Sequence, residues 1–182
     1  AVGYQSGDSI SSGSQNTIVG STADVSATAN NQTAIGFGAS CSAANEIVLG
    51  NSNVTALRCG AGTIAELSDE RDKKDIIDLP WGLDFIDKLR PVQFTWDRRV
   101  LTPEDVNHSK NGKKRAGFLA QDFLRAMPNG ENDILDLVYE VSEERMEAKY
   151  GALLPMLTQA IKDLKAQNEA LMARVEALEN KN

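Results

Sequence analysis

The sequence predicts a mixed fold: a repetitive β-rich module, a small α+β module and a long C-terminal coiled-coil helix, assembled as an intertwined homotrimer. Three observations predict it. Short apolar segments that end in glycine recur within residues 1–67. The composition changes near residue 68, and leucine recurs every seven residues beyond residue 154.

The repeats consist of an apolar pair followed by glycine. They are Ala1-Val2-Gly3, Ile18-Val19-Gly20, Ala34-Ile35-Gly36 and Val48-Leu49-Gly50. An amide or acidic residue stands four positions before each of the later three glycines (Asn16, Gln32 and Glu46). One such strand buries little surface, so we expect the units to stack as a parallel β-solenoid with the apolar pair facing inward. The core would be thin, and lateral association of three copies would compensate for it. A disordered Ser/Gly/Asn linker is the alternative, which the periodicity disfavours.

The repeats resemble the head repeats of trimeric autotransporter adhesins, which also occur in phage fibre shafts. The resemblance covers about residues 1–53 and implies a trimeric left-handed β-roll. Residues 51–67 are then a connector to the second module.

Composition places the boundary between the modules near Leu67–Ser68. Residues 1–67 hold nine of the fourteen glycines, no proline, no lysine and a single arginine, Arg58. Residues 68–182 hold all five prolines and both tryptophans. We therefore expect two domains, 1–67 and 68–182, with the coiled-coil helix at about 152–182.

Composition also argues against several classes of partner. The net charge of −7 gives no electrostatic case for nucleic acid. No apolar stretch approaches the roughly 20 residues that cross a bilayer, so no membrane partner is expected. Cys41 and Cys59 are too few for a disulfide framework. His108, the single histidine, falls in a polar loop from Asn107 to Gly112, which argues against a His-based triad or metal site. We expect no metal and no cofactor.

A candidate nucleophile and base open the second module. The segment Ser68-Asp69-Glu70-Arg71-Asp72-Lys73-Lys74 places a serine five residues before a lysine. A lysine activates a serine hydroxyl where burial or cationic neighbours lower its pKa towards neutrality. Taken alone, these seven residues are more typical of a charged surface turn than of a catalytic pair.

The features that follow resemble the phage intramolecular chaperone family, also called the S74 peptidase family, found at the ends of endosialidases, tail fibres and neck appendages. Its opening Ser-Asp-x-Arg-x-Lys is matched by Ser68, Asp69, Arg71 and Lys73. The later features come in order and end in the long helix: Ile76-Ile77, a helix within 81–89, a strand at 92–96, Ala116-Gly117-Phe118-Leu119-Ala120-Gln121-Asp122 and Tyr150-Gly151-Ala152-Leu153-Leu154-Pro155. Phe118 and Leu119 are expected in the core.

The resemblance implies that Ser68 is the nucleophile and Lys73 the general base. Lys74 is a poorer candidate, because it is one position off the family spacing and points to the opposite face if the segment is extended. A serine reaches the preceding carbonyl through a five-membered ring, so Leu67–Ser68 is the expected scissile bond. A link between cutting and assembly would require the Ser68–Lys73 contact to form only in the trimer.

The last helix carries a heptad repeat. Leu157, Leu164, Leu171 and Leu178 recur at one seam position, and the other position is occupied by Leu154, Ile161, Asn168 and Val175. This spacing predicts a coiled coil. Ile, Val and Asn168 at one seam position with leucine at the other favour a dimer, whereas the family resemblance implies a trimer. We expect the trimer, because the repeats also favour three chains.

These observations predict a C-terminal chaperone of a phage tail fibre or spike. It would trimerise, fold the β-fibre and release itself by one self-cleavage at Leu67–Ser68, as a single-turnover Ser–Lys endopeptidase. The expected location is the virion tail, with the chain itself as partner and a host-cell receptor as a further partner through the fibre. The alternative is a trimeric structural or adhesive fibre tip that is not cut. A bacterial surface adhesin and a membrane-bound transcription factor fit the sequence less well, since neither a C-terminal membrane β-strand pattern nor a transmembrane segment is seen.

Overall fold

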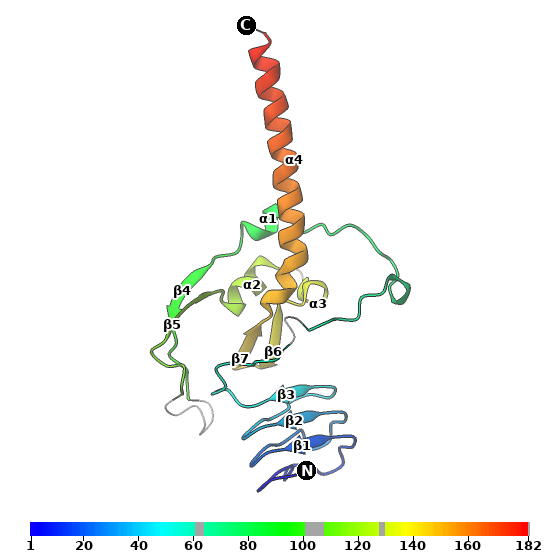
Figure 1. Ribbon diagram of the computed structural model, residues 1–182, viewed down its shortest axis with the longest axis vertical. Helices are drawn as coiled ribbons and strands as arrows, with labels where there is room; N and C mark the ends of the chain where they lie inside the picture. Colours follow the sequence, from blue (N-terminus) through cyan, green and yellow to red (C-terminus); the bar gives the residue numbers. More distant parts are fainter. Residues whose placement is uncertain (61–63, 101–107, 128–129, 182) are drawn as a thin grey trace. The chain divides into compact units, whose positions relative to one another are not determined.

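The computed structural model describes residues 1–60, 64–100, 108–127 and 130–181. The chain forms two compact units. Unit 1 comprises Ala1–Thr63 and Thr95–Arg115, and unit 2 comprises Ile64–Phe94 and Ala116–Asn182. The fold is mixed α/β with a long C-terminal helix, α4 (Leu154–Glu179) (Figure 1).

Three repeats of unit 1 stack through short parallel strands. They are β1 (Thr17–Val19), β2 (Thr33–Ile35) and β3 (Ile47–Leu49), in the order β1-β2-β3 (Figure 1). Ile18 lies opposite Ala34, and Ala34 lies opposite Val48. Val2 of the first repeat forms a parallel bridge with Val19. The four glycine-terminated segments are therefore successive rungs of one stack.

The expectation that both residues of each apolar pair face inward is wrong. Ile18 and Ala34 are buried, with Val48 packed against them, while Val19, Ile35 and Leu49 are exposed. The reason is the pleat, because consecutive residues of a strand point to opposite faces. Each of the strands β1, β2 and β3 therefore has one apolar side chain toward the core of the stack and one on its outer face.

The backbone geometry that recurs from turn to turn explains the glycine at the end of each rung. Gly20 has φ of 141°, and a Cβ there would overlap the carbonyl group of Gly36. Left-handed backbone recurs at Gln15, Asn31 and Asn45, one residue before the polar residue of each repeat. Such positions favour glycine or asparagine.

The polar residues four positions before the glycines hold the turns together. The Asn16 side-chain oxygen accepts a hydrogen bond from the Gln32 backbone N–H at 2.9 Å. Gln32 is buried, and its amide donates to the Ala43 carbonyl at 2.8 Å. The Glu46 carboxylate accepts from the backbone N–H of Ser42 at 2.6 Å and of Ala43 at 3.0 Å. These bonds satisfy backbone groups that a thin core leaves without strand partners.

The core of unit 2 forms between short helices and a hairpin. The elements are α1 (Leu83–Ile86), α2 (Ala120–Ala126), α3 (Asn132–Leu135) and the antiparallel strands β6 (Val138–Ser142) and β7 (Arg145–Ala148). A 3₁₀ helix, η3 (Tyr150–Leu153), leads into α4. Their buried apolar side chains form one cluster: Phe85, Leu89, Phe123, Ala126, Met127, Leu135, Leu137, Val138, Leu153 and Met156. Phe118 packs against this cluster as expected, but Leu119 is 38% exposed, so its placement in the core is wrong.

A second hairpin joins β4 (Val92–Thr95) to β5 (Lys114–Gly117). The turn at Asn111-Gly112 is present, with Gly112 at φ of 78°. His108, although it lies in a polar loop, is 3% exposed, and its Nδ1 accepts a hydrogen bond from the Lys110 backbone N–H. Asn107 lies outside the described residues.

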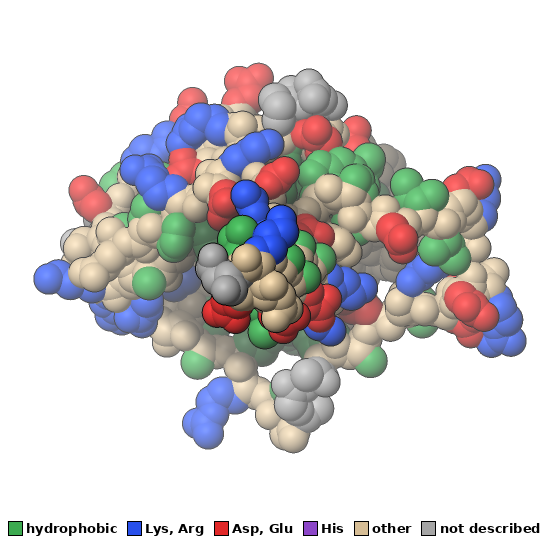
Figure 2. All heavy atoms as spheres, turned by 90° about the horizontal axis from the view of Figure 1, so that it is seen from above, with side chains coloured by type: hydrophobic (Ala, Val, Ile, Leu, Met, Phe, Trp, Pro, Cys, Tyr) green, Lys and Arg blue, Asp and Glu red, His purple; other side chains and the backbone are tan. Residues whose placement is uncertain are grey.

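Helix α4 has two faces with different surroundings. Met156 and Ala160 are buried, and the helix packs against α1. The predicted seam residues are between 40% and 69% exposed: Leu154, Leu157, Ile161, Leu164, Leu171, Val175 and Leu178. Viewed from the C-terminal end of α4, hydrophobic side chains lie on the visible surface beside charged ones (Figure 2). The helix therefore docks on its own unit with one face and presents its heptad seam to the outside.

Across the part of the chain that the structure describes, no helix combines the length and the apolar character needed to cross a membrane.

Candidate functional site

The predicted nucleophile lies on an extended arm of unit 2. Figure 1 shows the chain before α1 running outward to a single helical turn and back. Every residue from Ile64 to Asp78 is exposed. These include four large apolar side chains, those of Ile64, Leu67, Ile76 and Ile77.

The turn at the end of this arm is a 3₁₀ helix, η1 (Glu70–Asp72), and Asp69 is its N-cap. The Asp69 carboxylate accepts a hydrogen bond from the Arg71 backbone N–H at 2.9 Å. The Arg71 guanidinium also donates to both carboxylate oxygens of Asp69, at 2.9 and 2.5 Å. These hydrogen bonds from Arg71 lower the pKa of the Asp69 carboxyl. The Asp-x-Arg part of the motif thus stabilises the turn locally.

The turn brings Ser68 and Lys73 together. Lys73 Nζ lies 2.7 Å from Ser68 Oγ, within hydrogen-bond distance. The segment is not extended from 68 to 73, because η1 reverses it, and Lys73 returns to extended backbone just after the turn. Among the described residues, no hydrogen bond joins Lys74 to Ser68. The spacing of five residues therefore matches the length of one capped 3₁₀ turn.

The contact is already made within one chain, so the condition that would link cutting to assembly, a contact formed only in the trimer, is not met. Assembly, if it controls cutting, has to act on something other than this distance. Both side chains are exposed to water in the single chain. Water favours the protonated form of a lysine, whereas a lysine that serves as base needs burial or neighbouring cations. The described chain therefore places Ser68 and Lys73 as a nucleophile and a base would be placed, but it does not bury them.

The scissile bond predicted from the sequence is equally accessible. Leu67 is fully exposed, and Ser68 follows it directly. Among the described residues, no backbone or side-chain donor of the same chain is hydrogen-bonded to the Leu67 carbonyl. An acyl transfer requires donors aimed at the developing oxyanion.

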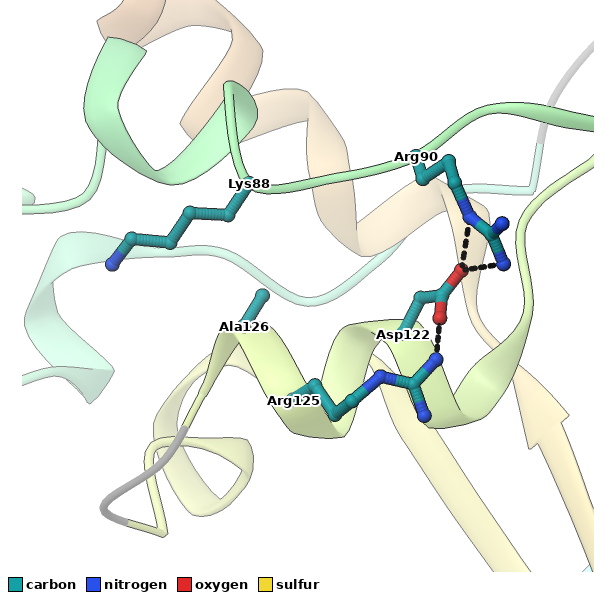
Figure 3. Close-up of a pocket in the computed structure, with 5 residues that line it drawn as sticks. All are labelled: Lys88, Arg90, Asp122, Arg125 and Ala126. Carbon is teal, nitrogen blue, oxygen red and sulfur yellow. Dashed lines mark hydrogen bonds and ion pairs between the residues drawn. The ribbon is translucent and has the colours of Figure 1, made fainter.

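A second group of charged residues lines a cavity of about 400 Å³ in unit 2: Lys88, Arg90, Asp122 and Arg125, together with Ala126. We call it the cationic pocket. Asp122 on α2 is the anchor, with its side chain only 8% exposed. It accepts hydrogen bonds from Arg90 at 3.4 Å and from Arg125, one turn further along α2. Figure 3 shows the two arginines converging on Asp122 and Lys88 extending away on the other side of Ala126.

The cationic pocket was not found from the sequence. The spacing of Asp122 and Arg125 by three residues on a helix is a local signal for their ion pair. Arg90 is 32 positions from Asp122, and no sequence pattern links them.

Other motif residues are structural. The Tyr150 hydroxyl accepts a hydrogen bond from the Phe118 N–H at 3.1 Å and donates to the Phe118 carbonyl at 3.2 Å. A Cβ at Gly117 would lie 2.7 Å from that hydroxyl, which explains the glycine. Gln121 is exposed. Among the described residues, no cluster of His, Cys, Asp and Glu is arranged to hold a metal ion.

Comparison with known families gives one match. Residues 68–130 match the family model described as the chaperone of endosialidase, a peptidase family. The match begins at Ser68 and includes η1, α1, β4, β5 and α2. It supports an intramolecular chaperone role of the kind found in phage tail fibres, in a family with self-cleaving activity. No curated protein matches the chain.

Proposed function

We propose that residues 68–182 are an intramolecular chaperone that trimerises, folds a β-solenoid fibre segment formed by residues 1–67, and then cuts itself off at Leu67–Ser68. The observation that carries the proposal is the 2.7 Å contact between Ser68 Oγ and Lys73 Nζ. It stands at the first residue of the segment that matches the chaperone-of-endosialidase family.

The proposed reaction is a single acyl transfer followed by hydrolysis. Neutral Lys73 takes the hydroxyl proton as Ser68 Oγ attacks the carbonyl carbon of Leu67. The C–N bond then breaks, and the proton passes from Lys73 to the departing nitrogen, which becomes the amine of Ser68. The acyl group now forms an ester on Ser68 Oγ. Water attacks this ester, leaving the Leu67 carboxylate and restoring the serine hydroxyl, so that the net change is the addition of one water.

Trimerisation is supported by the exposed seam of α4. Leucine lies at one seam position, and Leu154, Ile161, Asn168 and Val175 lie at the other. The apolar seam side chains are between 40% and 69% exposed. An uncovered heptad seam over several turns is stabilised by burial against other helices. We propose three chains, because the solenoid also needs lateral partners.

The β-solenoid is supported by the stack of β1, β2 and β3. The inner rung residues are small or single aliphatic side chains, so the core of one stack is thin. The outer residues Val19, Ile35 and Leu49 form an exposed apolar row along the parallel strands. Packing three such rows together would bury the surface that one chain leaves exposed.

The chaperone action follows from the order of events. Non-local β assembly is slow and prone to wrong register. A helix that joins three chains first turns the encounter of three repeats into a local event at high effective concentration. Removal of the template after folding leaves a fibre that cannot retrace its path, and its stability becomes kinetic. The corresponding location is the virion tail, with a host receptor contacted through the fibre.

The test is a denaturing gel of freshly expressed protein, with N-terminal sequencing of the fragments. We expect residues 1–67 and residues 68–182, the second beginning at Ser68, and a full-length chain for Ser68→Ala. An intact wild-type chain after assembly would instead support the alternative function, a trimeric structural or adhesive fibre tip that keeps residues 68–182.

A further inference from the structure

We infer that the cationic pocket of one copy receives the acidic cleavage segment, Glu66–Glu70, of a second copy, and thereby completes the environment of the Ser68–Lys73 pair. This inference rests on the proposed function and adds to it the partner surface that makes cutting depend on assembly. Both surfaces belong to unit 2, so each copy offers one pocket and one segment.

Among the residues that line it, the pocket has an excess of positive charge. Lys88, Arg90 and Arg125 line the pocket with a single carboxylate, that of Asp122, which binds the two arginines while Lys88 extends away from it (Figure 3). Asp122 lies between the two guanidinium groups and binds both, and the side chains of Arg90 and Arg125 remain 66% exposed. An arginine has five N–H donors in a fixed fork, so each keeps donors for a second acceptor. The arrangement is suited to carboxylates and carbonyl oxygens.

The segment has the complementary charge and is fully accessible. Glu66 and Glu70 stand two residues before and two after Ser68. Among the described residues, neither of these two carboxylates forms a hydrogen bond or ion pair, whereas the carboxylate of Asp69 is already held by Arg71. The exposed Leu67 lies between them, and the methyl group of Ala126 lies between Lys88 and the two arginines in the pocket (Figure 3). The segment thus has acidic residues on both sides of Leu67, and the pocket has cations on both sides of Ala126. The two surfaces are complementary in charge and in the position of their apolar groups.

Docking would supply three features that the single chain lacks at the Ser68–Lys73 pair: neighbouring cations, a donor for the oxyanion and shielding from water. Cations brought next to Lys73 disfavour its protonated form and favour the neutral amine that takes the serine proton. A guanidinium N–H near the Leu67 carbonyl can stabilise the oxyanion. Contact between the two surfaces also removes water from a segment in which every residue is now exposed.

A second copy is the occupant that the complementary charges and the exposed seam of α4 favour. Within the described chain, no contact joins the segment to the pocket, and the exposed seam of α4 provides the means to hold copies together. At the effective concentration of an assembled coiled coil, a modest electrostatic contact is sufficient for docking. A small anion in the pocket, or docking of a chain onto its own pocket, are the other outcomes that the experiment separates.

The experiment uses the full chain and two kinds of copy. One copy carries Arg90→Glu and Arg125→Glu but keeps Ser68, and the other carries Ser68→Ala but keeps the pocket. Expressed alone, the first should assemble, as light scattering reports, and should cut slower than wild type by about tenfold or more. Co-expressed in mixed assemblies, it should regain cutting, because its segment docks in the intact pocket of the Ser68→Ala copy. Recovery requires a pocket in trans, so continued absence of cutting in mixed assemblies would overturn the inference.

Charge exchange provides the second arm and guards against a folding defect. Lys88→Glu, at an exposed residue, should slow cutting, while Lys162→Glu, an equal charge change on the outer face of α4, should not. Adding Glu66→Arg and Glu70→Arg to the Arg90→Glu, Arg125→Glu chain should restore cutting when that chain is expressed alone. Titration of wild type with inorganic phosphate should leave the assembled rate unchanged, and inhibition that saturates would instead identify a small-anion site.

Failure of this inference is distinct from failure of the proposed function. A wild-type chain that cuts at Leu67–Ser68, with Lys88→Glu and both arginine reversals cutting at the same rate, overturns the docking alone. A wild-type chain that is never cut overturns both.

Discussion

The carboxylate of Asp163, in the first half of α4, accepts a hydrogen bond from the backbone N–H of Leu83 at 3.0 Å, and so caps the first turn of α1 from a residue 80 positions away. Gln159 donates to the same carboxylate at 2.8 Å. The contact fixes the C-terminal helix to α1, the first helix after the extended arm of residues 64–78. It therefore connects α4, which is expected to join the chains, with α1, which follows the arm that carries Ser68.

This contact predicts a pH dependence of stability. The Leu83 N–H, and next the Gln159 amide, hold the pKa of Asp163 below its ordinary value of 3.8. A carboxyl with a depressed pKa stabilises the fold above its ordinary pKa, and this contribution is lost as the pH falls through the lower, folded-state pKa. We expect wild type to melt at a higher temperature than Asp163→Asn at pH 6, and the two to converge as the pH falls below the lowered pKa of Asp163. Thermal melting followed by circular dichroism at several pH values measures this, and a constant difference would contradict it.

Gly82 tests the same junction by packing. A Cβ at residue 82 would overlap the Asp163 carboxylate and lie 3.0 Å from the Gln159 side chain. We expect Gly82→Ala to lower the free energy of unfolding by about 1–3 kcal/mol, as overpacked sites do. Gly112→Ala is not a matched control, because Gly112 has positive φ, whereas Gly151→Ala meets no atom within 4 Å. Equal denaturant midpoints for Gly82→Ala and Gly151→Ala would argue against a tight α1–α4 junction.

The dyad assignment predicts different effects for two adjacent lysines. Lys73→Ala should slow cutting by about 10²–10⁴-fold, the usual contribution of a general base. Lys74→Ala should cut at close to the wild-type rate, because only Lys73 is within hydrogen-bond distance of Ser68 Oγ. Time courses on denaturing gels distinguish the two variants. Normal processing of Lys73→Ala would show that another group activates Ser68.

The seam of α4 predicts the coupling of assembly to cutting. Leu164→Asp with Leu171→Asp should abolish both trimerisation and cutting, because unpaired charges in a buried seam are costly. Ala166→Asp with Ala173→Asp adds the same charges on the opposite face of the heptad and should leave both intact. Light scattering gives the mass, and gels give the cutting. A monomeric seam variant that is fully cut would mean that the site needs no second copy.

The chaperone role predicts that cutting removes the ability to refold. Ser68→Ala should reach the same fold as wild type, but should recover more trimer after heating because its template stays attached. The cut fibre should melt irreversibly, with a midpoint that depends on scan rate. Residues 1–67 expressed alone should not form a stable trimer. Equal refolding yields for cut and uncut protein would leave residues 68–182 as a fibre tip without a chaperone role.

The sequence by itself determined the features that depend on short-range periodicity. Glycines at the ends of the apolar pairs predicted the rungs, since a left-handed turn in close contact with the next rung excludes a side chain at Gly20. The heptad predicted α4, and its seam is exposed as a coiled-coil face would be. The resemblance of Ser68-Asp-x-Arg-x-Lys73 to a family motif singled out a pair that one capped turn brings into contact. Patterns of this kind are local, because the backbone repeats over a few residues and sets which side chains share a face.

Only the tertiary structure decided the contacts between residues distant in the chain. The sequence gives no signal that Arg90 converges with Arg125 on Asp122, or that Asp163 caps α1. It also did not predict that His108 is buried, or that the second residue of each apolar pair faces outward. These outcomes depend on how separate elements pack, and packing is set by the sum of many weak contacts that no single spacing encodes. For this protein, a local motif and its resemblance to a family therefore located the candidate cleavage site, whereas the proposed partner surface emerged only from the packing of the segment after α1 against α2.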